Sequence, residues 1–188
     1  INSNLRYFIF TLDPEIAHNL AIKSLKFNIV PNVLHKDTNN TSFKSKLFNK
    51  NYRLIKTDLN DLTATSKAIK ISNPDLIFHL AAESHVDRSI ESPKEFIQSN
   101  IIGTFNLLEN SKNHWEKLDP IRKRKFRFLH ISTDEVFGSL DDEGLFNENS
   151  AYDPRSPYSA SKASSDHLVN AWFHTFKLPI LRTNCSNN

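Results

Sequence analysis

The chain has 188 residues, of which 38% are hydrophobic and 24% are charged, and these shares are ordinary for a globular protein with one hydrophobic core. A net charge of +3 is too small to indicate binding to nucleic acid or to an acidic membrane surface, because such binding needs several cations on one face. Cys185 is the only cysteine, which excludes an intrachain disulfide and a cysteine-based zinc site and favours a reducing, cytoplasmic location.

The first segment with a clear period lies near the N-terminus. Apolar residues return at helical spacing between Asp13 and Phe27. Asp13 is followed by Pro and Glu, an N-cap acceptor, a first-turn proline and an acid that together mark a helix start. We expect this helix to end near Pro31.

A change of pattern separates two parts of the chain. The polar run 36–42 is typical of an exposed loop or linker, and a different rhythm begins after Asn51. We therefore expect a helical N-terminal segment with a polar linker at 1–50 and a separate domain at 51–188. No run approaches the roughly 18 consecutive apolar residues that a membrane-spanning helix needs, so we expect no membrane span.

The second part alternates short apolar runs with amphipathic segments, which is typical of successive βα units. This pattern predicts an α/β fold with a parallel sheet and flanking helices. A long helix is expected at 93–112, with Phe96, Ile97, Ile101, Phe105 and Leu108 on the face that points toward the core. The expected strands are 53–56, 75–80, 126–131 and 179–183, and the expected helices are 62–71, 93–112 and 156–176.

Small and polar side chains follow two of these strands. Ala81 to His85 follow the strand that ends at Leu80, and Ser132 to Glu135 follow the strand that ends at Ile131. In an open parallel sheet, ligands bind beyond the carboxyl ends of the strands. We therefore expect the functional site to include both segments.

Tyr158 and Lys162 form a third candidate element. They lie four residues apart on a predicted helix and therefore on one face of it. A nearby ammonium would favour the phenolate and lower the pKa of Tyr158, so that its oxygen could act as a base. The spacing alone usually marks two surface residues, and its position one βα unit after Ser132 and Thr133 makes it informative.

Four segments contain these candidate residues and their neighbours. They are Leu80-Ala-Ala-Glu-Ser-His-Val-Asp-Arg-Ser89, His130-Ile-Ser-Thr-Asp-Glu-Val-Phe-Gly138, Pro157-Tyr-Ser-Ala-Ser-Lys-Ala-Ser-Ser-Asp-His167 and Thr183-Asn-Cys-Ser-Asn-Asn188. Together they resemble the dTDP-glucose 4,6-dehydratases, a family of extended short-chain dehydrogenase/reductases, and the resemblance covers about residues 52–188.

The resemblance implies a reaction on dTDP-glucose in which bound NAD stores a hydride and is restored in each turnover. Tyr158 would deprotonate the C4 hydroxyl, and Thr133 would hydrogen-bond the C4 oxygen. Glu135 would remove the C5 proton, while Asp134 would protonate the departing C6 hydroxyl. These two adjacent carboxyl groups can take opposite roles only if their surroundings separate their pKa values.

The resemblance also implies which residues bind ligands. Catalysis would rest on Thr133, Asp134, Glu135, Tyr158 and Lys162. The substrate dTDP-glucose would contact Ser84, Thr133 and Asn187, and no metal is implied. The NAD-binding residues would be Asp58, Leu59, Leu80, Ala81, Ala82, Ser99, Tyr158, Lys162 and Asn188.

The chain departs from the family pattern before Gly103, its first glycine. Family members begin with a strand and a G-x-x-G-x-x-G turn that bring a helix N-terminus to the NAD pyrophosphate. The expected fold is therefore a partial Rossmann-like sheet that lacks its first βαβ unit, which would leave the ladder beside 75–80 unpaired. The chain also begins at Ile1 and contains no Met, so we expect a fragment.

The N-terminal residues resemble a different family. Leu5 to His18 and Ser42 to Phe48 are similar to the N-terminal helices of quinone-dependent dihydroorotate dehydrogenases. The resemblance implies a chimera joined near Asn51. No activity is transferred from it, because the flavin and substrate residues of that family lie in a barrel that this sequence does not contain.

Alternatives remain open from sequence alone. The domain could be a related nucleotide-sugar epimerase or decarboxylase, although the Thr-Asp-Glu trio favours the dehydratase, or it could be a non-catalytic remnant unable to retain NAD. The resemblance also implies a homodimer formed through the helices at 93–112 and 156–176. The remaining candidates have structural readings: hydrogen-bonded histidines at 79, 85 and 130, a solvated basic turn at 122–125 and a buried inert thiol at Cys185.

Overall fold

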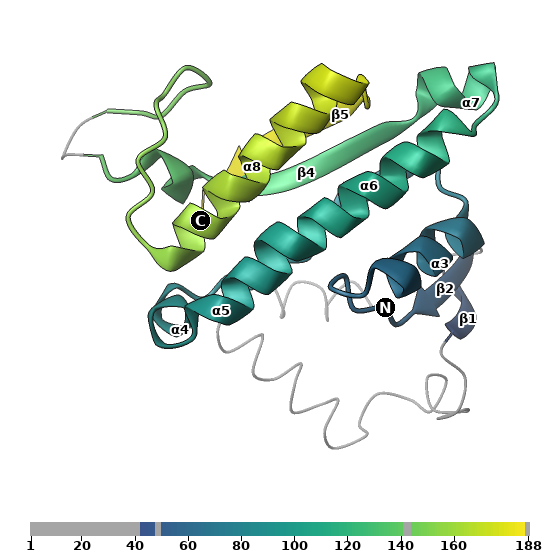
Figure 1. Ribbon diagram of the computed structural model, residues 1–188, viewed down its shortest axis with the longest axis horizontal. Coiled ribbons are helices and arrows are strands. Elements are labelled where there is room, and N and C mark those ends of the chain that lie inside the picture. Colours follow the sequence, from purple (N-terminus) through teal and green to yellow (C-terminus); the bar gives the residue numbers. More distant parts are fainter. Residues whose placement is uncertain (1–41, 48–49, 141–143, 187–188) are drawn as a thin grey trace, which may run out of the picture. The chain divides into compact units, whose positions relative to one another are not determined.

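The computed structural model describes residues 42–47, 50–140 and 144–186 (Figure 1). It separates the chain into two compact units, the second of which is Lys56–Asn188. The expected helix between Asp13 and Phe27 lies outside the described residues. Each unit is described by itself below.

The first unit contains an antiparallel hairpin. Strand β1 (Ser42–Leu47) pairs with strand β2 (Lys50–Ile55) in a register that joins Ser42 to Ile55. The predicted strand at 53–56 is confirmed, but the helical character implied for Ser42 to Phe48 is wrong. Pairing in a hairpin gives the backbone N–H and C=O groups of both segments partners that isolated short strands would lack.

The second unit is built on a parallel sheet, as predicted. Its strands are β3 (Leu76–His79), β4 (Arg127–Thr133) and β5 (Ile180–Cys185), in the order β3-β4-β5. Helices α6 and α8 lie side by side along β4, and they cover one face of the sheet (Figure 1). This arrangement is the partial Rossmann-like α/β fold that the sequence predicts.

The helices begin and end at the signals that the sequence carries. Asp61 caps α3 by accepting hydrogen bonds from the N–H groups of Thr63 and Ala64, and Asn73 ends it in the left-handed region. The helices of the second unit are α3 (Leu62–Ser72), α4 (Val86–Glu91), α5 (Pro93–Phe96), α6 (Gly103–Glu116), α7 (Pro120–Lys125) and α8 (Pro157–Phe176), with a π-helix at Ile97–Ile102 and a 3-10 helix at Asp134–Phe137.

The predicted long helix is therefore a rod of three parts, α5, the π-helix and α6. Phe96 and Leu108 are buried as predicted, whereas Ile97 and Phe105 are 51% and 38% exposed, so their predicted core positions are wrong. A π turn takes more residues than the 3.6 of an α turn, so it rotates the residues near it away from the face that a constant period predicts.

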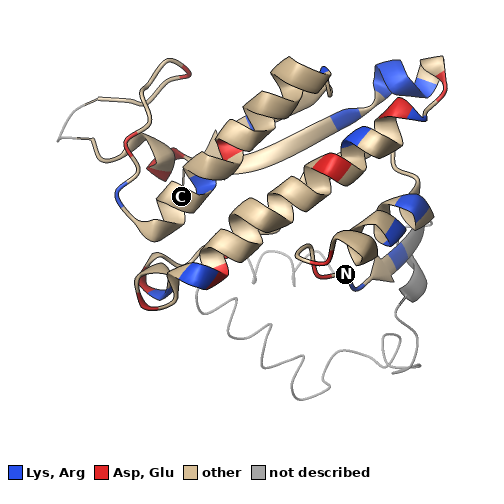
Figure 2. Cartoon of the chain, in the orientation of Figure 1, with Lys and Arg blue, Asp and Glu red and all other residues tan. Residues whose placement is uncertain are grey.

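The basic run at 122–125 forms helix α7 rather than a turn. Figure 2 shows these positive charges gathered at one end of the second unit. Arg122 Nε donates to Asp75 Oδ1 at 2.6 Å, and Lys123 lies over the ring of Trp115. Two of the four cations, Arg122 and Lys123, therefore have partners within the second unit.

The core lies between the sheet and α6 and α8, and it includes Phe126, Phe128, Leu107, Leu108, Val169 and Leu178. The other face of the sheet carries Leu76, Phe78 and Leu181, which are all about half exposed. Within the described part of the chain, β3 pairs with β4 alone. This is the unpaired edge that the sequence predicts beside 75–80, since parallel sheets are normally covered and paired on both sides.

Candidate active site

The carboxyl end of β4 forms one wall of the site. Ser132 and Thr133 are buried, and the chain turns directly into the 3-10 helix that begins at Asp134. The Thr133 hydroxyl accepts from the Glu135 N–H at 3.3 Å and donates to Asp134 Oδ1 at 3.3 Å. Thr133 therefore caps the turn that presents the two carboxyl groups.

The first turns of α8 form the opposite wall. Pro157 at the first helical position and a capping box between Ser156 and Ser159 fix where this helix begins. Tyr158 and Lys162 follow at once, and both side chains are more than nine-tenths buried. Lys162 Nζ donates to the carbonyl oxygen of Ile131 at 2.7 Å, so it links α8 to the end of β4.

Electrostatics at Tyr158 differ from the expectation. Burial raises the pKa of Tyr158, and a hydrogen bond with Thr133 opposes that rise only in part. Burial also lowers the pKa of Lys162, which disfavours the ammonium form, although the negative charge of Asp166 opposes this. The predicted lowering of the Tyr158 pKa by Lys162 is therefore wrong.

The carboxyl group of Glu135 has a raised pKa. Partial burial raises its pKa, and the charge of Asp134 raises it further. A raised pKa makes Glu135 a stronger base once it is ionised, but it also leaves more of the group protonated. The expected division, with Asp134 as acid and Glu135 as base, remains a prediction.

A buried network behind Thr133 centres on Asp166, which the sequence did not single out. The Asp166 carboxylate accepts from Ser132 Oγ and from the hydroxyl of Tyr152, each at 2.8 Å, and His130 Nε2 lies 3.0 Å from it. Burial would raise the pKa of Asp166, but these partners outweigh burial and lower it. Asp166 stands one helical turn beyond Lys162, and this spacing was the available signal.

The buried histidines have structural partners. His79 Nε2 lies 2.8 Å from the hydroxyl oxygen of Thr104, and its ring centroid is 5.2 Å from that of His130. Burial, with smaller contributions from His130 and Lys162, lowers the pKa of His79 to about 3. Among the residues described, no group of three or more candidate ligands is placed to hold a metal ion.

His79 gives the protein a predictable acid sensitivity. The unfolded chain protonates His79 near its ordinary pKa of 6.5, whereas the folded chain does so only near 3. Below 6.5 the unfolded state therefore binds more protons, and the free energy of unfolding decreases by up to about 1.4 kcal/mol per pH unit until the folded pKa is reached. The contribution of neutral His79 to the free energy of unfolding is therefore fully present above pH 6.5.

We expect His79→Gln to remove this dependence. Urea unfolding of both proteins at about pH 7 and about pH 5 should show a loss on acidification that is about 2 kcal/mol smaller in the variant. His130 is present in both proteins, so its own titration cancels in the comparison. Equal losses in the two proteins would contradict the assignment.

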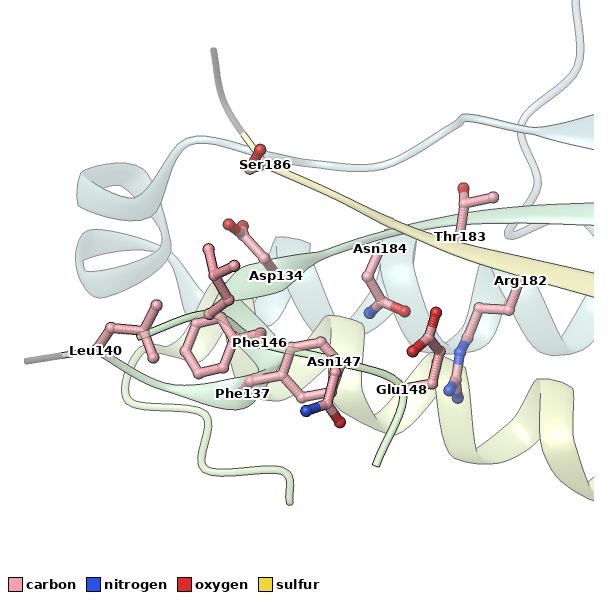
Figure 3. Close-up of a pocket in the computed structure, with 11 residues that line it drawn as sticks. Asp134, Phe137, Leu140, Phe146, Asn147, Glu148, Arg182, Thr183, Asn184 and Ser186 are labelled. Atoms are coloured by element: carbon pink, nitrogen blue, oxygen red, sulfur yellow. The ribbon is translucent and has the colours of Figure 1, made fainter. Parts of the chain in front are cut away.

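A cavity of about 520 Å³ opens beside Asp134 (Figure 3). Phe137 and Phe146, with ring centroids 5.3 Å apart, supply an apolar wall, while Glu148 and Arg182 supply charge. Leu140 and residues 145–148 of the lining lie outside the recognised motifs, so no sequence signal pointed to them. The lining consists of Asp134, Phe137, Leu140, Leu145, Phe146, Asn147, Glu148, Arg182, Thr183, Asn184 and Ser186.

The loop that lines this cavity is closed at its base. The N–H of Asp153 donates to the carbonyl oxygen of Val136 at 3.0 Å, so the chain leaves and re-enters at the same place. Gly138 has a φ of 93°, and a Cβ there would lie 2.9 Å from the Asp153 carbonyl oxygen. A larger residue at 138 would therefore be strained and would push the two loop ends apart.

The remaining predicted ligand residues lie at other strand ends. Leu80 is 66% exposed, and Ala81, Ala82 and Ser84 after it are also exposed, as a surface that receives a ligand requires. Asp58 is exposed and its Oδ1 accepts from the Asn60 N–H, while Leu59 and Ser99 are half-buried. Asn187 and Asn188 lie outside the described residues. Cys185 is exposed, so its predicted burial is wrong.

The structure thus brings together Thr133, Asp134 and Glu135 with Tyr158 and Lys162 at the carboxyl end of a parallel sheet. A buried tyrosine and lysine on the helix beside a Ser-Thr strand end define a Rossmann-like domain of the short-chain dehydrogenase/reductase type. No described helix has the length and apolar character to cross a membrane.

Comparisons with known proteins agree with this class. A family model described as GDP-mannose 4,6 dehydratase matches residues 20–188, and the chain belongs to this family. It is 51% identical over 140 residues to the dTDP-glucose 4,6-dehydratase of Xanthomonas campestris pv. campestris, covering 74% of this chain and 40% of the relative. The chain therefore spans about two fifths of the length of the curated relatives it matches.

Solved structures show the same likeness. The dTDP-glucose 4,6-dehydratase DesIV of Streptomyces venezuelae, solved with NAD bound, superposes with a TM-score of 0.61 at 37% identity, covering 70% of this chain and 37% of that one. The UDP-glucose 4-epimerase of Thermus thermophilus, also with NAD, reaches 0.60 at 25% identity, covering 68% and 39%. The fold is thus shared with epimerases, and the two matches differ mainly in sequence identity.

The comparisons give no support to the resemblance of residues 1–50 to dihydroorotate dehydrogenases. The family model instead begins at residue 20, within that segment. A junction near Asn51 stays a prediction, and no later step depends on it.

Proposed function

We propose that this chain carries the catalytic centre of a dTDP-glucose 4,6-dehydratase, which converts dTDP-glucose to dTDP-4-keto-6-deoxyglucose and water. The observation that carries the proposal is the placement of Thr133, Asp134 and Glu135 at the end of β4 beside the buried Tyr158 and Lys162. The names of the similar curated relatives support the same activity.

In this proposal each side chain has a stated task. Tyr158 accepts the proton of the C4 hydroxyl, and Thr133, buried at the end of β4, holds the C4 oxygen. Glu135 accepts the C5 proton, which the neighbouring ketone has made acidic, and Asp134 donates a proton to the departing C6 hydroxyl. The partial burial of Glu135 suits a proton acceptor that must act near neutral pH.

The described residues fit one side of an NAD site. The side chains of Ala81 and Ala82, directly after β3, are small and exposed, as close approach of a cofactor requires, and Lys162 would hold the nicotinamide ribose. Asp58, Leu59 and Ser99 would contact the adenosine side. NAD, when bound, supplies a hydride acceptor and donor for the sugar carbons.

The test is calorimetric titration of the purified chain with NAD, together with absorbance detection of the keto product from dTDP-glucose. Binding with turnover is the expected result. A folded chain that binds no NAD and forms no product would contradict the proposal for this chain and would favour a non-catalytic remnant. The lack of a G-x-x-G-x-x-G turn in the sequence is the observation that favours that second candidate.

The related epimerase reading makes a different prediction. An epimerase would convert dTDP-glucose to its C4 epimer without loss of water, and it would not need two carboxyl groups after Thr133. Mass spectrometry separates the two outcomes, since dehydration removes one water and epimerisation leaves the mass unchanged.

We also propose a homodimer formed by α8 and the rod that contains α6. Ile97 and Phe105 on the rod and Phe173 and Phe176 on α8 are each more than a third exposed, although all are apolar. The Phe105 ring meets that of Trp172 on α8, with centroids 5.8 Å apart, so the two helices share one apolar surface. Exposed patches of this kind commonly mark protein interfaces.

The cytoplasmic location expected from the sequence also stays a prediction.

A further inference from the structure

Asn100 is buried in the π-helix and uses its whole amide group. Its Oδ1 accepts from the backbone N–H of Glu83 at 2.9 Å, and its Nδ2 donates to the carbonyl oxygen of Glu83 at 2.9 Å. Nδ2 also donates to Ser161 Oγ on α8 at 2.9 Å. The side chain therefore joins three segments that are far apart in sequence.

The segments that Asn100 joins are those on which the site depends. Glu83 lies between Ala82 and Ser84, in the stretch expected to line the cofactor and contact substrate, and both of its backbone hydrogen-bonding groups are bound to Asn100. On the other side, Ser161 Oγ donates to the carbonyl oxygen of Tyr158 at 2.7 Å. Three successive hydrogen bonds, through the side chains of Asn100 and Ser161, thus connect the backbone of Glu83 to the backbone of Tyr158.

The π-helix explains how Asn100 reaches both partners. A π turn inserts an extra residue into a helix, and such turns are often found at functional sites. Here Asn100 is 1% exposed while Gln98, two residues earlier in the same segment, faces solvent. A buried asparagine that served only to fill space would leave polar atoms unpaired at a cost, whereas this one pairs both ends of its amide.

We propose that Asn100 is a positioning residue that holds the 81–84 segment at a fixed place relative to Tyr158. The inference rests on the proposed function, because the segment it holds is the one expected to receive NAD and the sugar. Asn100 itself touches neither reacting group. It acts by ordering the backbone of Glu83 before ligand binds.

The first test follows amide hydrogen exchange at residue 83 by NMR. We expect Asn100→Leu, which has a similar size but no hydrogen-bonding group, to speed exchange at this amide by at least about tenfold, with amides in the middle of α6 unchanged. Gln98→Ala in the same π segment and Glu83→Ala, which keeps the backbone, are matched controls that should leave exchange slow. Unchanged exchange in Asn100→Leu would overturn the proposal.

A second variant covers the case in which Asn100→Leu does not fold. Asn100→Asp keeps an acceptor for the Glu83 N–H but loses both donors, so residue 83 should stay protected while the Ser161 hydroxyl loses its partner. In this variant the Ser161 oxygen loses only the bond that it accepts from Asn100 and keeps its own bond to the Tyr158 carbonyl oxygen. We then expect faster exchange in the first turns of α8 around Tyr158, and Ser161→Ala, which removes both bonds, should show at least that change. Loss of protection at residue 83 in Asn100→Asp, or no change in α8, would count against the proposal.

The second measurement is NAD affinity. If the unmodified chain binds NAD, Asn100→Leu should weaken binding by about tenfold or more, while Gln98→Ala should not. Faster exchange at residue 83 with unaltered affinity would overturn the positioning role. If the unmodified chain does not bind NAD, the proposed function fails for this chain, and the exchange experiment still decides whether Asn100 orders Glu83.

Discussion

Tyr158→Phe is expected to lower turnover of dTDP-glucose by about 10²- to 10⁴-fold, the usual contribution of a general acid or base. The ring of Tyr158 is buried and meets Phe96 edge to face, with centroids 6.3 Å apart. Phenylalanine preserves this packing and removes only the hydroxyl. We therefore expect the unfolding midpoint to change little, and single-turnover measurement of ketone formation to show the loss.

Tyr152→Phe is the matched control for that experiment. Tyr152 also carries a hydroxyl near the site, but it donates to Asp166 behind Thr133 rather than to a reacting atom. The Tyr152→Phe variant should lose more stability than Tyr158→Phe does, and its turnover should decrease much less. Equal losses of turnover in the two variants would mean that Tyr158 acts through structure, and retained turnover in Tyr158→Phe would remove it from the chemistry.

Asp166→Ala is expected to destabilise the second unit by about 3 to 5 kcal/mol. The substitution leaves the buried hydroxyls of Ser132 and Tyr152 without their acceptor, and each such loss has a substantial cost. Because domains are stable by only about 5 to 15 kcal/mol, much of the fold would be unpopulated at moderate urea. Equilibrium urea unfolding, followed by tryptophan fluorescence, measures the change.

Asp166→Asn separates the acceptor from the charge. Its amide oxygen can still accept from Ser132 or Tyr152, so we expect a smaller loss of stability than with alanine. A variant on the same helix with an exposed side chain, Asn170→Ala, should change stability little. If Asp166→Ala costs no more than Asn170→Ala, the buried network contributes nothing to the fold.

The elements of the second unit could be predicted because local signals and burial agree there. The apolar runs at 75–80 and 126–131 and the helical periods at 62–71 and 156–176 each point to the structure that is found. The parallel order of the strands followed from their alternation with helices. The tyrosine and lysine pair was visible from its spacing, and its meaning came from the surrounding motifs.

Other features depend on contacts that no local pattern reveals. The π-helix departs from a constant helical period, and Asn100 within it has its partners, Glu83 and Ser161, elsewhere in the sequence. The raised pKa of Tyr158 reflects burial by the assembled fold, which spacing from Lys162 could not foretell. Helix α7 was not predicted, because its four consecutive cations were interpreted as a solvated turn. Its helix-start signal is the N-cap residue Asp119 followed by Pro120.

The hydrogen bond that closes the base of the loop from Gly138 to Asp153 makes the geometry of the site independent of the number of residues in the loop. With the Asp153 N–H bound to Val136, residues inserted or deleted between these points need not move Thr133 or Tyr158. The same loop carries Phe146 and Glu148 into the cavity. If the proposed function holds, exchange of this loop for a relative's loop should change which sugar is accepted and leave Thr133 and Tyr158 in place, and grafting of such a loop tests this.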